Sequence, residues 1–357
     1  MLNGNLIDLN DLPISEWNRI IALAQEIIKR PELYSEKCYG KILATLFYEP
    51  STRTQMSFQT AMLKLGGRII GFDDPQNSSV SKGESLKDTI TIVSNYADMI
   101  VLRHPNEGAA RAASLYASCP VINAGDGGHL HPSQTLTDLL TLSVEKGRLT
   151  DLVVGICGDL VNGRTVHSLI KALSCYRGNS FVLISTPNLR VPSYIKDIMS
   201  AAGCPFTEVD SLSEAIPMLD VLYMTRIQRE RFTSEEEYLR EKDVYRLDRE
   251  KLMSARSDLR ILHPLPRVDE IAIEVDDDPR AAYFRQASYG VYARMALLIR
   301  LTTPPEYPVA EPAPKQPLPH HCENPRCITQ KEGYLPGLFT SGGDMLVCDY
   351  CDSRLLI

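Results

Sequence analysis

Short, continuous apolar runs alternate along much of the chain with segments whose apolar residues recur every three or four positions. The continuous runs are rich in β-branched residues and predict strands, whereas the longer periodicity predicts amphipathic helices. Strands that are apolar on both faces are typical of parallel sheets covered by helices on each side. The predicted strands are Lys41–Phe47, Arg68–Phe72, Asp98–Leu102, Val121–Asn123, Leu152–Cys157, Phe181–Ser185, Val221–Met224 and Leu259–Leu262.

A predicted helix at Ser133–Lys146 separates these strands into two groups, each large enough for one sheet. A second amphipathic helix, Gln286–Leu301, follows the last strand and is expected to pack back on the first group. The pattern therefore predicts an α/β fold with two doubly wound parallel-sheet domains. The first spans residues 1–133 and is completed by helix 286–301, and the second spans residues 134–285.

The composition changes after Leu301. Residues 302–319 contain seven prolines and few large apolar side chains, so we expect a semi-rigid extended linker there. The linker leads to a short terminal module, residues 320–357. The module contains Cys322, Cys327, Cys348 and Cys351.

The spacing of these four cysteines is a zinc signature. Four residues separate the first pair, two separate the second pair, and twenty residues lie between the pairs. Four thiolates leave no open coordination position, so the predicted ion is a structural Zn²⁺, one per chain. A β module this small should fold only with its metal. Two disulfides are the alternative arrangement of the same cysteines.

The bulk composition narrows the class of protein. Apolar residues make up 44% and charged residues 23% of the 357 residues, as in ordinary soluble globular proteins. The net charge of -7 argues against a general nucleic-acid binder, and no apolar run approaches the ~20 residues that span a bilayer. The N-terminal residues lack the features of a signal peptide. A cytoplasmic location is expected, with the other cysteines as thiols in a reducing compartment.

The turn Ser51-Thr52-Arg53-Thr54 is the first candidate site. It follows a buried strand and opens a helix whose apolar residues recur at helical spacing. The helix start offers backbone N–H groups and the positive end of the helix dipole. Two hydroxyls and a guanidinium lie in the same turn, so we predict a binding site for an anion, most naturally phosphate.

Further polar clusters follow other predicted strands. Ligands of open α/β sheets bind beyond the carboxyl ends of the strands, so these clusters are expected to share a site. Four of the five contain an Arg, which suits a carboxylate or phosphate. A polar, Gly-containing segment at 78–84 is interpreted as a lid that presents Lys82 to an anion, with an ordinary mobile loop as the alternative. The clusters are Arg103-His104-Pro105, His131-Pro132-Ser133-Gln134-Thr135, Arg164-Thr165, Arg226-Ile227-Gln228 and His263-Pro264-Leu265-Pro266-Arg267.

Two other kinds of chemistry are disfavoured by the sequence. Gly155, Gly158 and Gly163 fall at intervals of three and five, which does not match the dinucleotide-binding GxGxxG spacing. No serine lies in a G-x-S-x-G elbow, and Cys157 falls within a predicted buried strand. A nicotinamide site and a side-chain nucleophile are therefore not expected.

These motifs, in this order, resemble the catalytic chain of aspartate carbamoyltransferase, from about Leu6 to Leu301. That family condenses carbamoyl phosphate with L-aspartate to give N-carbamoyl-L-aspartate and phosphate in pyrimidine biosynthesis. The resemblance implies a homotrimer with active sites shared between subunits and needs no organic cofactor. It also implies that Glu49, Arg164 and Arg231 bridge the two domains when they close.

The resemblance assigns roles to the residues of each motif. Arg53, Thr54, Arg103 and His131 would bind carbamoyl phosphate and stabilise charge on the carbonyl oxygen during attack by the aspartate amine. Lys82 would act in the site of the neighbouring subunit, together with Ser79, whose assignment rests on a loop one residue shorter than in some members. The other substrate-binding residues implied are Ser51, Thr52, Gln134, Arg164, Thr165, Arg226, Gln228, Pro264 and Leu265.

Three alternatives remain open. The first is a carbamoyltransferase for ornithine or another amino acid. Ornithine carbamoyltransferases share the carbamoyl phosphate half, but their usual His-Cys-Leu-Pro run is His263-Pro264-Leu265-Pro266 here, and Gln55 replaces an Arg. A non-catalytic scaffold of the same fold is the second alternative, although every expected anion-binding residue is present. The third is a nucleic-acid role for the zinc module, against which its few basic residues argue.

The terminal module itself resembles the zinc domain of the aspartate carbamoyltransferase regulatory chain, on the segment Cys322–Ile328. In that family the zinc domain docks on catalytic chains and links trimers, which makes the module a candidate link to a higher assembly. The nucleotide-binding domain that normally precedes it has no counterpart between Leu301 and His320. The hypothesis is a module that braces subunit contacts and has no effector site.

Overall fold

The computed structural model describes residues 4–227, 234–236, 238, 245–303, 317–342 and 345–356. The chain forms two compact units. One comprises Met1–Ser133 with Val291–Ile357, and the other comprises Gln134–Gly290. The predicted residues Gln228 and Arg231, and most of the predicted linker, lie outside the described residues.

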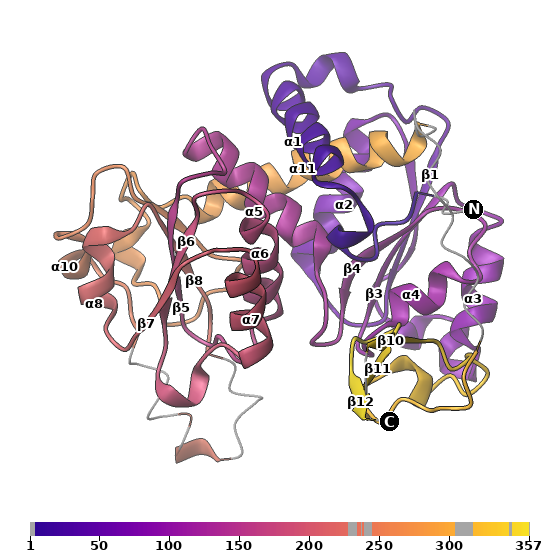
Figure 1. Cartoon of the computed structure of the whole chain (residues 1–357). Helices are drawn as coiled ribbons and strands as arrows, with labels where there is room; N and C mark the ends of the chain where they lie inside the picture. The colour runs from indigo at the N-terminus through magenta and orange to yellow at the C-terminus, as the bar shows by residue number, and fades with distance from the viewer. Residues whose placement is uncertain are drawn as a thin grey trace. The chain divides into compact units, whose positions relative to one another are not determined.

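The first unit is built on a four-stranded parallel sheet with strand order β2-β1-β3-β4. Figure 1 labels three of these strands, β1, β3 and β4. Strands β3 and β4 are buried along their whole length, and β1 is buried after its first residue. This burial explains the mostly apolar sequence of β1 and the apolar run that begins β3. The edge strand β2 is mostly exposed. The strands are β1 (Ile42–Phe47), β2 (Arg68–Phe72), β3 (Met99–His104) and β4 (Val121–Asp126).

Helices of the first unit bury apolar faces at helical spacing. In α1, for example, Trp17, Ile20, Ala24 and Ile27 recur at intervals of three or four and are almost completely buried. The helices are α1 (Ile14–Lys29), α2 (Thr52–Lys64), α3 (Leu86–Val93) and α4 (Ala109–Ser114). Short 3₁₀ helices are η1 (Leu9–Asp11), η2 (Pro31–Tyr34), η3 (Pro75–Asn77) and η4 (Ser79–Lys82).

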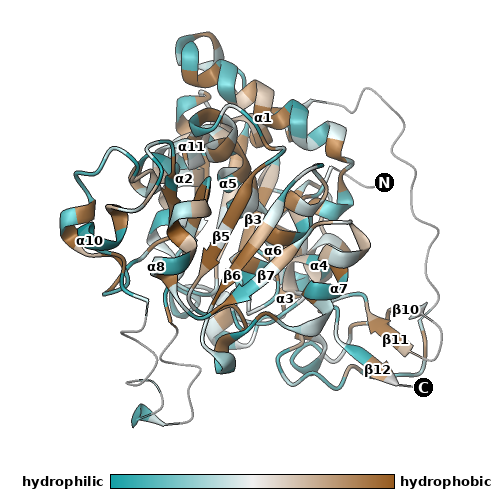
Figure 2. Ribbon diagram, turned by 60° about the vertical axis from the view of Figure 1, so that its left-hand side comes forward, coloured by the Kyte–Doolittle hydropathy of each residue, from teal (hydrophilic) through white to brown (hydrophobic). Residues whose placement is uncertain are grey.

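The second unit has a five-stranded parallel sheet with order β7-β6-β5-β8-β9. Its central strands are brown, hence hydrophobic, in Figure 2. The sequence did not predict β7, an edge strand whose Thr207 and Glu208 break the apolar run. The strands are β5 (Val153–Cys157), β6 (Ser180–Ile184), β7 (Phe206–Val209), β8 (Val221–Met224) and β9 (Arg260–Leu262).

Two long helices, α5 (Pro132–Glu145) and α11 (Tyr283–Thr302), contain the points where the chain passes from one unit to the other. No helix in the described part of the chain is long and apolar enough to cross a membrane. The remaining helices are α6 (Arg164–Ser174), α7 (Ser193–Ala201), α8 (Leu212–Ala215), α10 (Arg249–Leu252), η5 (Pro187–Leu189), η6 (Ile216–Met218) and η8 (Ile273–Val275).

The C-terminal module is a small antiparallel sheet that belongs to the first unit. Its strands are β10 (Phe339–Gly342), β11 (Met345–Cys348) and β12 (Arg354–Leu356), preceded by η9 (Ile328–Gln330). Apolar residues of the module pack in one cluster with residues of β1, β3 and α4. The predicted fold class, two parallel-sheet α/β domains with a small β module, is confirmed.

Candidate active site

The turn between β1 and α2 presents the first group of predicted residues. Ser51 occupies the N-cap position, but its hydroxyl bonds to the Thr54 hydroxyl at 3.1 Å, and its side chain caps no α2 amide. The amide groups at this helix start are therefore not occupied by the Ser51 side chain, which suits an incoming anion. Arg53 is exposed, but its guanidinium is partly shielded from solvent by neighbouring atoms. This partial burial, and then the positive charge of Arg103, lower the pKa of Arg53.

Arg103, at the end of β3, is held in place by two fixed partners. Its Nη1 donates to the Ala124 carbonyl oxygen at 3.2 Å, and its Nη2 pairs with Glu49 Oε1 at 3.1 Å. Arg103 is only 7% exposed, and among the described residues its buried Nε–H has no hydrogen-bond partner. Two guanidinium groups that approach each other beside a helix N-terminus form a site that an anion would stabilise.

His131 lies in the loop between β4 and α5 and is buried, with its Nδ1 3.4 Å from the Ser133 hydroxyl. Asp126 organises this loop. One of its oxygens accepts from the Leu130 amide at 3.2 Å, and the other accepts from the Gly108 amide at 2.8 Å. The carboxylate thus ties the His131 loop to the loop that follows Arg103.

The segment that carries Ser79 and Lys82 is folded into η4, whose start is capped by Ser78 through its hydroxyl and the Val80 amide at 3.3 Å. Lys82 and Ser79 are both exposed. Among the described residues, neither forms a hydrogen bond or ion pair with the Ser51–Thr54 turn.

In the second unit, Asp138 organises a further group of predicted residues. Its carboxylate accepts from Gln134 Nε2 at 2.8 Å, from Gln286 Nε2 at 2.7 Å and from the Tyr223 hydroxyl at 3.0 Å. Burial, and then the Asp138 charge, raise the pKa of Tyr223, which also contacts Thr165. Tyr223 therefore stays a proton donor, and the network fixes Gln134 near the start of α5.

The turn after β9 has an uncommon backbone. Leu265 adopts a left-handed φ of 55°, and its amide donates to His263 Nδ1 at 2.7 Å. Since Nδ1 accepts, the ring proton lies on Nε2, which is 2.7 Å from Glu270 Oε1. Burial is the largest single effect and opposes ionisation of Glu270, but the hydrogen bond and charge of His263 and the bonds from backbone amides together lower the pKa of Glu270 overall. This chain of bonds fixes the Pro264 and Leu265 segment.

Arg164 and Thr165 open α6, and Arg226 follows β8, so all three lie at carboxyl ends of strands as the pattern predicts. Sequence reasoning missed the supporting acids Asp126, Asp138 and Glu270. Asp138 did give a signal, because it interrupts the apolar face of a helix that is otherwise buried. A buried carboxylate needs such partners.

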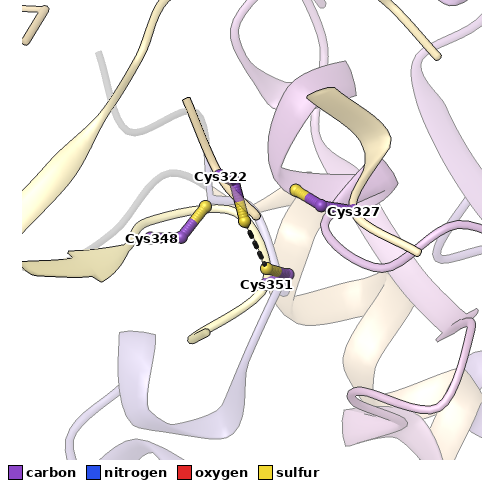
Figure 3. Close-up of side chains that lie close together, drawn as sticks. All are labelled: Cys322, Cys327, Cys348 and Cys351. Carbon is purple, nitrogen blue, oxygen red and sulfur yellow. Dashed lines mark hydrogen bonds between the residues drawn. The ribbon is translucent and has the colours of Figure 1, made fainter. Parts of the chain in front are cut away.

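The four module cysteines form a separate cluster with all four side chains buried (Figure 3). Their sulfur atoms lie within 4.8 Å of one another, and the Cys322 and Cys351 sulfurs are 3.5 Å apart. Four sulfurs at ~2.3 Å from one tetrahedral ion would be about 3.8 Å apart. The Thr329 hydroxyl also donates to Cys327 Sγ at 3.2 Å, as an outer-shell partner would. The cluster can therefore hold a metal ion.

Comparison with known proteins agrees with this arrangement. Residues 4–144 match the carbamoyl-P binding domain of aspartate/ornithine carbamoyltransferases, and residues 150–301 match the Asp/Orn binding domain. An aspartate carbamoyltransferase catalytic subunit of Clostridium botulinum is 60% identical over 298 residues, covering 83% of this chain and 97% of that protein. One from Clostridium novyi is 57% identical over 302 residues, covering 84% and 99%.

Solved structures give the same result. The catalytic subunit of M. jannaschii aspartate transcarbamoylase is 47% identical with a TM-score of 0.79, covering 84% of this chain and 97% of that chain. Aspartate transcarbamoylase from Trypanosoma cruzi in complex with carbamoyl phosphate and aspartate is 35% identical with a TM-score of 0.78, covering 83% and 95%. The chain therefore belongs to the aspartate/ornithine carbamoyltransferase family.

Proposed function

We propose that the protein transfers the carbamoyl group of carbamoyl phosphate to L-aspartate, giving N-carbamoyl-L-aspartate and phosphate in pyrimidine biosynthesis. The observation that carries this proposal is the pair of guanidinium groups, Arg53 and Arg103, beside the start of α2. The aspartate carbamoyltransferase relatives support it, including the Trypanosoma cruzi enzyme in complex with both substrates.

Residues 1–133 would form the carbamoyl-phosphate domain, completed by helix 286–301. Ser51, Thr52 and the α2 amides would hold the phosphate, and Arg53 would neutralise it. Arg103, with its unpaired Nε–H, and Thr54 and His131 are donors suited to the carbonyl oxygen, where charge develops during attack. Because phosphate leaves as a stable anion in a positively charged turn, the step requires no covalent enzyme intermediate.

Residues 134–285 would form the aspartate domain. Arg164 and Arg226 would bind the two carboxylates of aspartate, with Thr165 and Gln228 as further donors. Pro264 and Leu265 would offer backbone carbonyls to the attacking amine or the carbamoyl nitrogen, at a position fixed by the His263–Glu270 bond. Gln134, held by Asp138, would complete the carbamoyl half.

Residues 320–357 would form a zinc domain like that of the aspartate carbamoyltransferase regulatory chain, with one structural Zn²⁺ per chain on Cys322, Cys327, Cys348 and Cys351. The buried thiol set and its spacing support this proposal. The ion would stabilise the module and supply no chemistry to the transfer reaction.

Assembly and location are proposed on the resemblance alone. The enzyme would form a homotrimer in which Lys82 and Ser79 act in the site of a neighbouring subunit. A cytoplasmic location would keep the cysteines, including the exposed Cys175, reduced.

Substrate choice tests the proposal. With carbamoyl phosphate present, we expect N-carbamoyl-L-aspartate from aspartate and no citrulline from ornithine, because two Arg residues in the second unit suit a second carboxylate better than an ammonium group. Citrulline formation at a comparable rate would replace the proposal with ornithine carbamoyltransfer. Substrate binding without either product would favour a scaffold.

A further inference from the structure

We propose that the C-terminal module positions the Lys82 segment of its own chain, with Glu332 and Tyr334 as the positioning residues. Both side chains bond to the first turn of α3, the helix that follows the Lys82 segment directly. The inference rests on the proposed function only for the role of Lys82.

The backbone N–H groups at the start of α3 find hydrogen-bond acceptors both in the helix's own N-cap and in the module. The Leu86 amide donates to Glu332 Oε1 at 3.0 Å, and the Lys87 amide donates to the Tyr334 hydroxyl at 2.9 Å. The next amide, of Asp88, donates to the Ser85 hydroxyl at 3.1 Å. A helix leaves its first amides without intrahelical partners, so the module supplies acceptors for two groups that the α3 sequence itself leaves open.

The orientation of these bonds is reinforced by packing. The Tyr334 ring contacts the Tyr116 ring at a centroid distance of 6.0 Å, and the Lys87 ammonium lies 5.2 Å from the Tyr116 ring centroid. Glu332 adds a carboxylate at the positive end of the α3 dipole, where a negative charge is favoured. The interaction therefore combines two hydrogen bonds, a dipole interaction and an aromatic contact.

The Lys82 segment is coupled to this helix start through very few residues. Only Gly83, Glu84 and Ser85 separate Lys82 from α3. The Glu84 carboxylate accepts from the Thr89 hydroxyl in α3 at 2.8 Å, so the connecting segment is tied to the same helix turn. A change in the position or fraying of the first α3 turn must therefore shift Lys82.

The module also contacts two other segments that carry site residues, and it lies beside α4 in Figure 1. Glu107, four residues beyond Arg103, forms two backbone hydrogen bonds with the module. Its amide donates to the Arg326 carbonyl and its carbonyl accepts from the Ile328 amide, both at 2.9 Å. His129, two residues before His131, lies 2.9 Å from Asp352.

Close approach at α4 shows that this docking leaves little room. Gly108 has a left-handed φ of 83°, and a Cβ built there would lie 2.5 Å from the Tyr350 Cβ. Tyr350 is 2% exposed, and its hydroxyl donates to the Pro336 carbonyl at 3.0 Å. The module is therefore seated against its own chain and not merely tethered to it.

The test removes the two acceptors while leaving the cysteine cluster intact, in the full-length zinc-loaded protein. E332A/Y334F deletes both, whereas Glu332→Gln keeps a carbonyl oxygen that can accept from the Leu86 amide. Thr340→Val is the matched control, because it removes a 2.6 Å bond to Asp349 within the module. Readouts are hydrogen exchange at the Leu86 and Lys87 amides, zinc content, and kcat and KM for carbamoyl phosphate.

We expect E332A/Y334F to retain zinc, to exchange the two amides on the order of tenfold faster and to lose about tenfold in kcat/KM. Glu332→Gln should be close to the parent protein, and Thr340→Val should change neither readout. In a Lys82→Ala background, the double variant should cause no further loss of activity, because both act through the same side chain. An additive further loss would overturn the proposal, as would unchanged exchange at both amides.

The exchange measurement separates this inference from the proposed function. If the parent protein lacks carbamoyltransferase activity while E332A/Y334F accelerates exchange, the module still positions the segment but the role of Lys82 is wrong. If the parent protein is active and exchange is unaffected, the proposed function stands and the positioning role fails.

Discussion

Replacement of Arg53 by Ala separates catalysis from folding at the centre of the proposed site. Arg53 is exposed, and the described residues give it no ion pair or hydrogen bond through its guanidinium. Partial burial, and then the like charge of Arg103, lower the pKa of Arg53. The side chain therefore contributes little to folding and is present at some electrostatic cost.

The two expected magnitudes differ strongly. Loss of one donor aimed at developing charge typically costs 10²–10³ in kcat, or about 3–4 kcal/mol of transition-state stabilisation. Loss of an exposed, unpaired side chain changes the free energy of unfolding by less than about 1 kcal/mol, and relief of repulsion with Arg103 favours an increase. Activity should fall by at least about a hundredfold while the Tm changes by less than about 4 °C.

The assay is formation of N-carbamoyl-L-aspartate at saturating substrates, together with thermal unfolding with and without inorganic phosphate. Phosphate should raise the Tm of the parent protein and not that of Arg53→Ala, since binding to the native state stabilises it. Arg68→Ala is a suitable control, because Arg68 is an exposed Arg on the edge strand β2. A kcat within threefold of the parent value would refute the role of Arg53, and a large fall in Tm would refute the stability argument.

Two further predictions concern the module and a buried histidine. Chelation should release one zinc per chain, unfold the module and expose the apolar residues that pack with it in the first unit. Native mass spectrometry should find a trimer both before and after chelation. A larger assembly that falls to trimers on chelation would instead make the module a link between trimers. His104 is 8% exposed, and burial lowers its pKa from 6.5 to about 4, so the unfolded chain binds the additional proton between these values. The free energy of unfolding should therefore fall by up to about 3 kcal/mol as the pH is lowered from about 6.5 to about 4. Urea unfolding of His104→Gln should show a weaker pH dependence than the parent protein. The same pH dependence in both proteins would contradict this prediction.

The sequence predicted best where a single physical cause acts over several residues. The strands β1, β3, β5, β6 and β8 are buried on both faces, so their apolar runs report directly on their place in the sheets. The strand β7 carries Thr207 and Glu208 and has no such signal, because none of its four residues is fully buried.

Candidate site residues could be predicted because polar motifs follow the strand ends in the sequence. The residues that hold these site residues in place could not be predicted. Glu270 follows His263 by seven residues, and Asp138 meets Tyr223 from a distant part of the chain. Such pairs depend on tertiary packing and leave no local spacing. The same holds for Glu332 and Tyr334, whose partners at the α3 start lie 246 and 247 residues away.

The proposed reaction joins a carbamoyl group to aspartate with release of phosphate. The direct measurement supplies ¹³C-labelled carbamoyl phosphate and aspartate to the purified protein and follows both products by NMR. We predict one labelled N-carbamoyl-L-aspartate for each phosphate released, with loss of both in Arg53→Ala. Phosphate release without labelled N-carbamoyl-L-aspartate would contradict the claim and assign the anion site to another reaction.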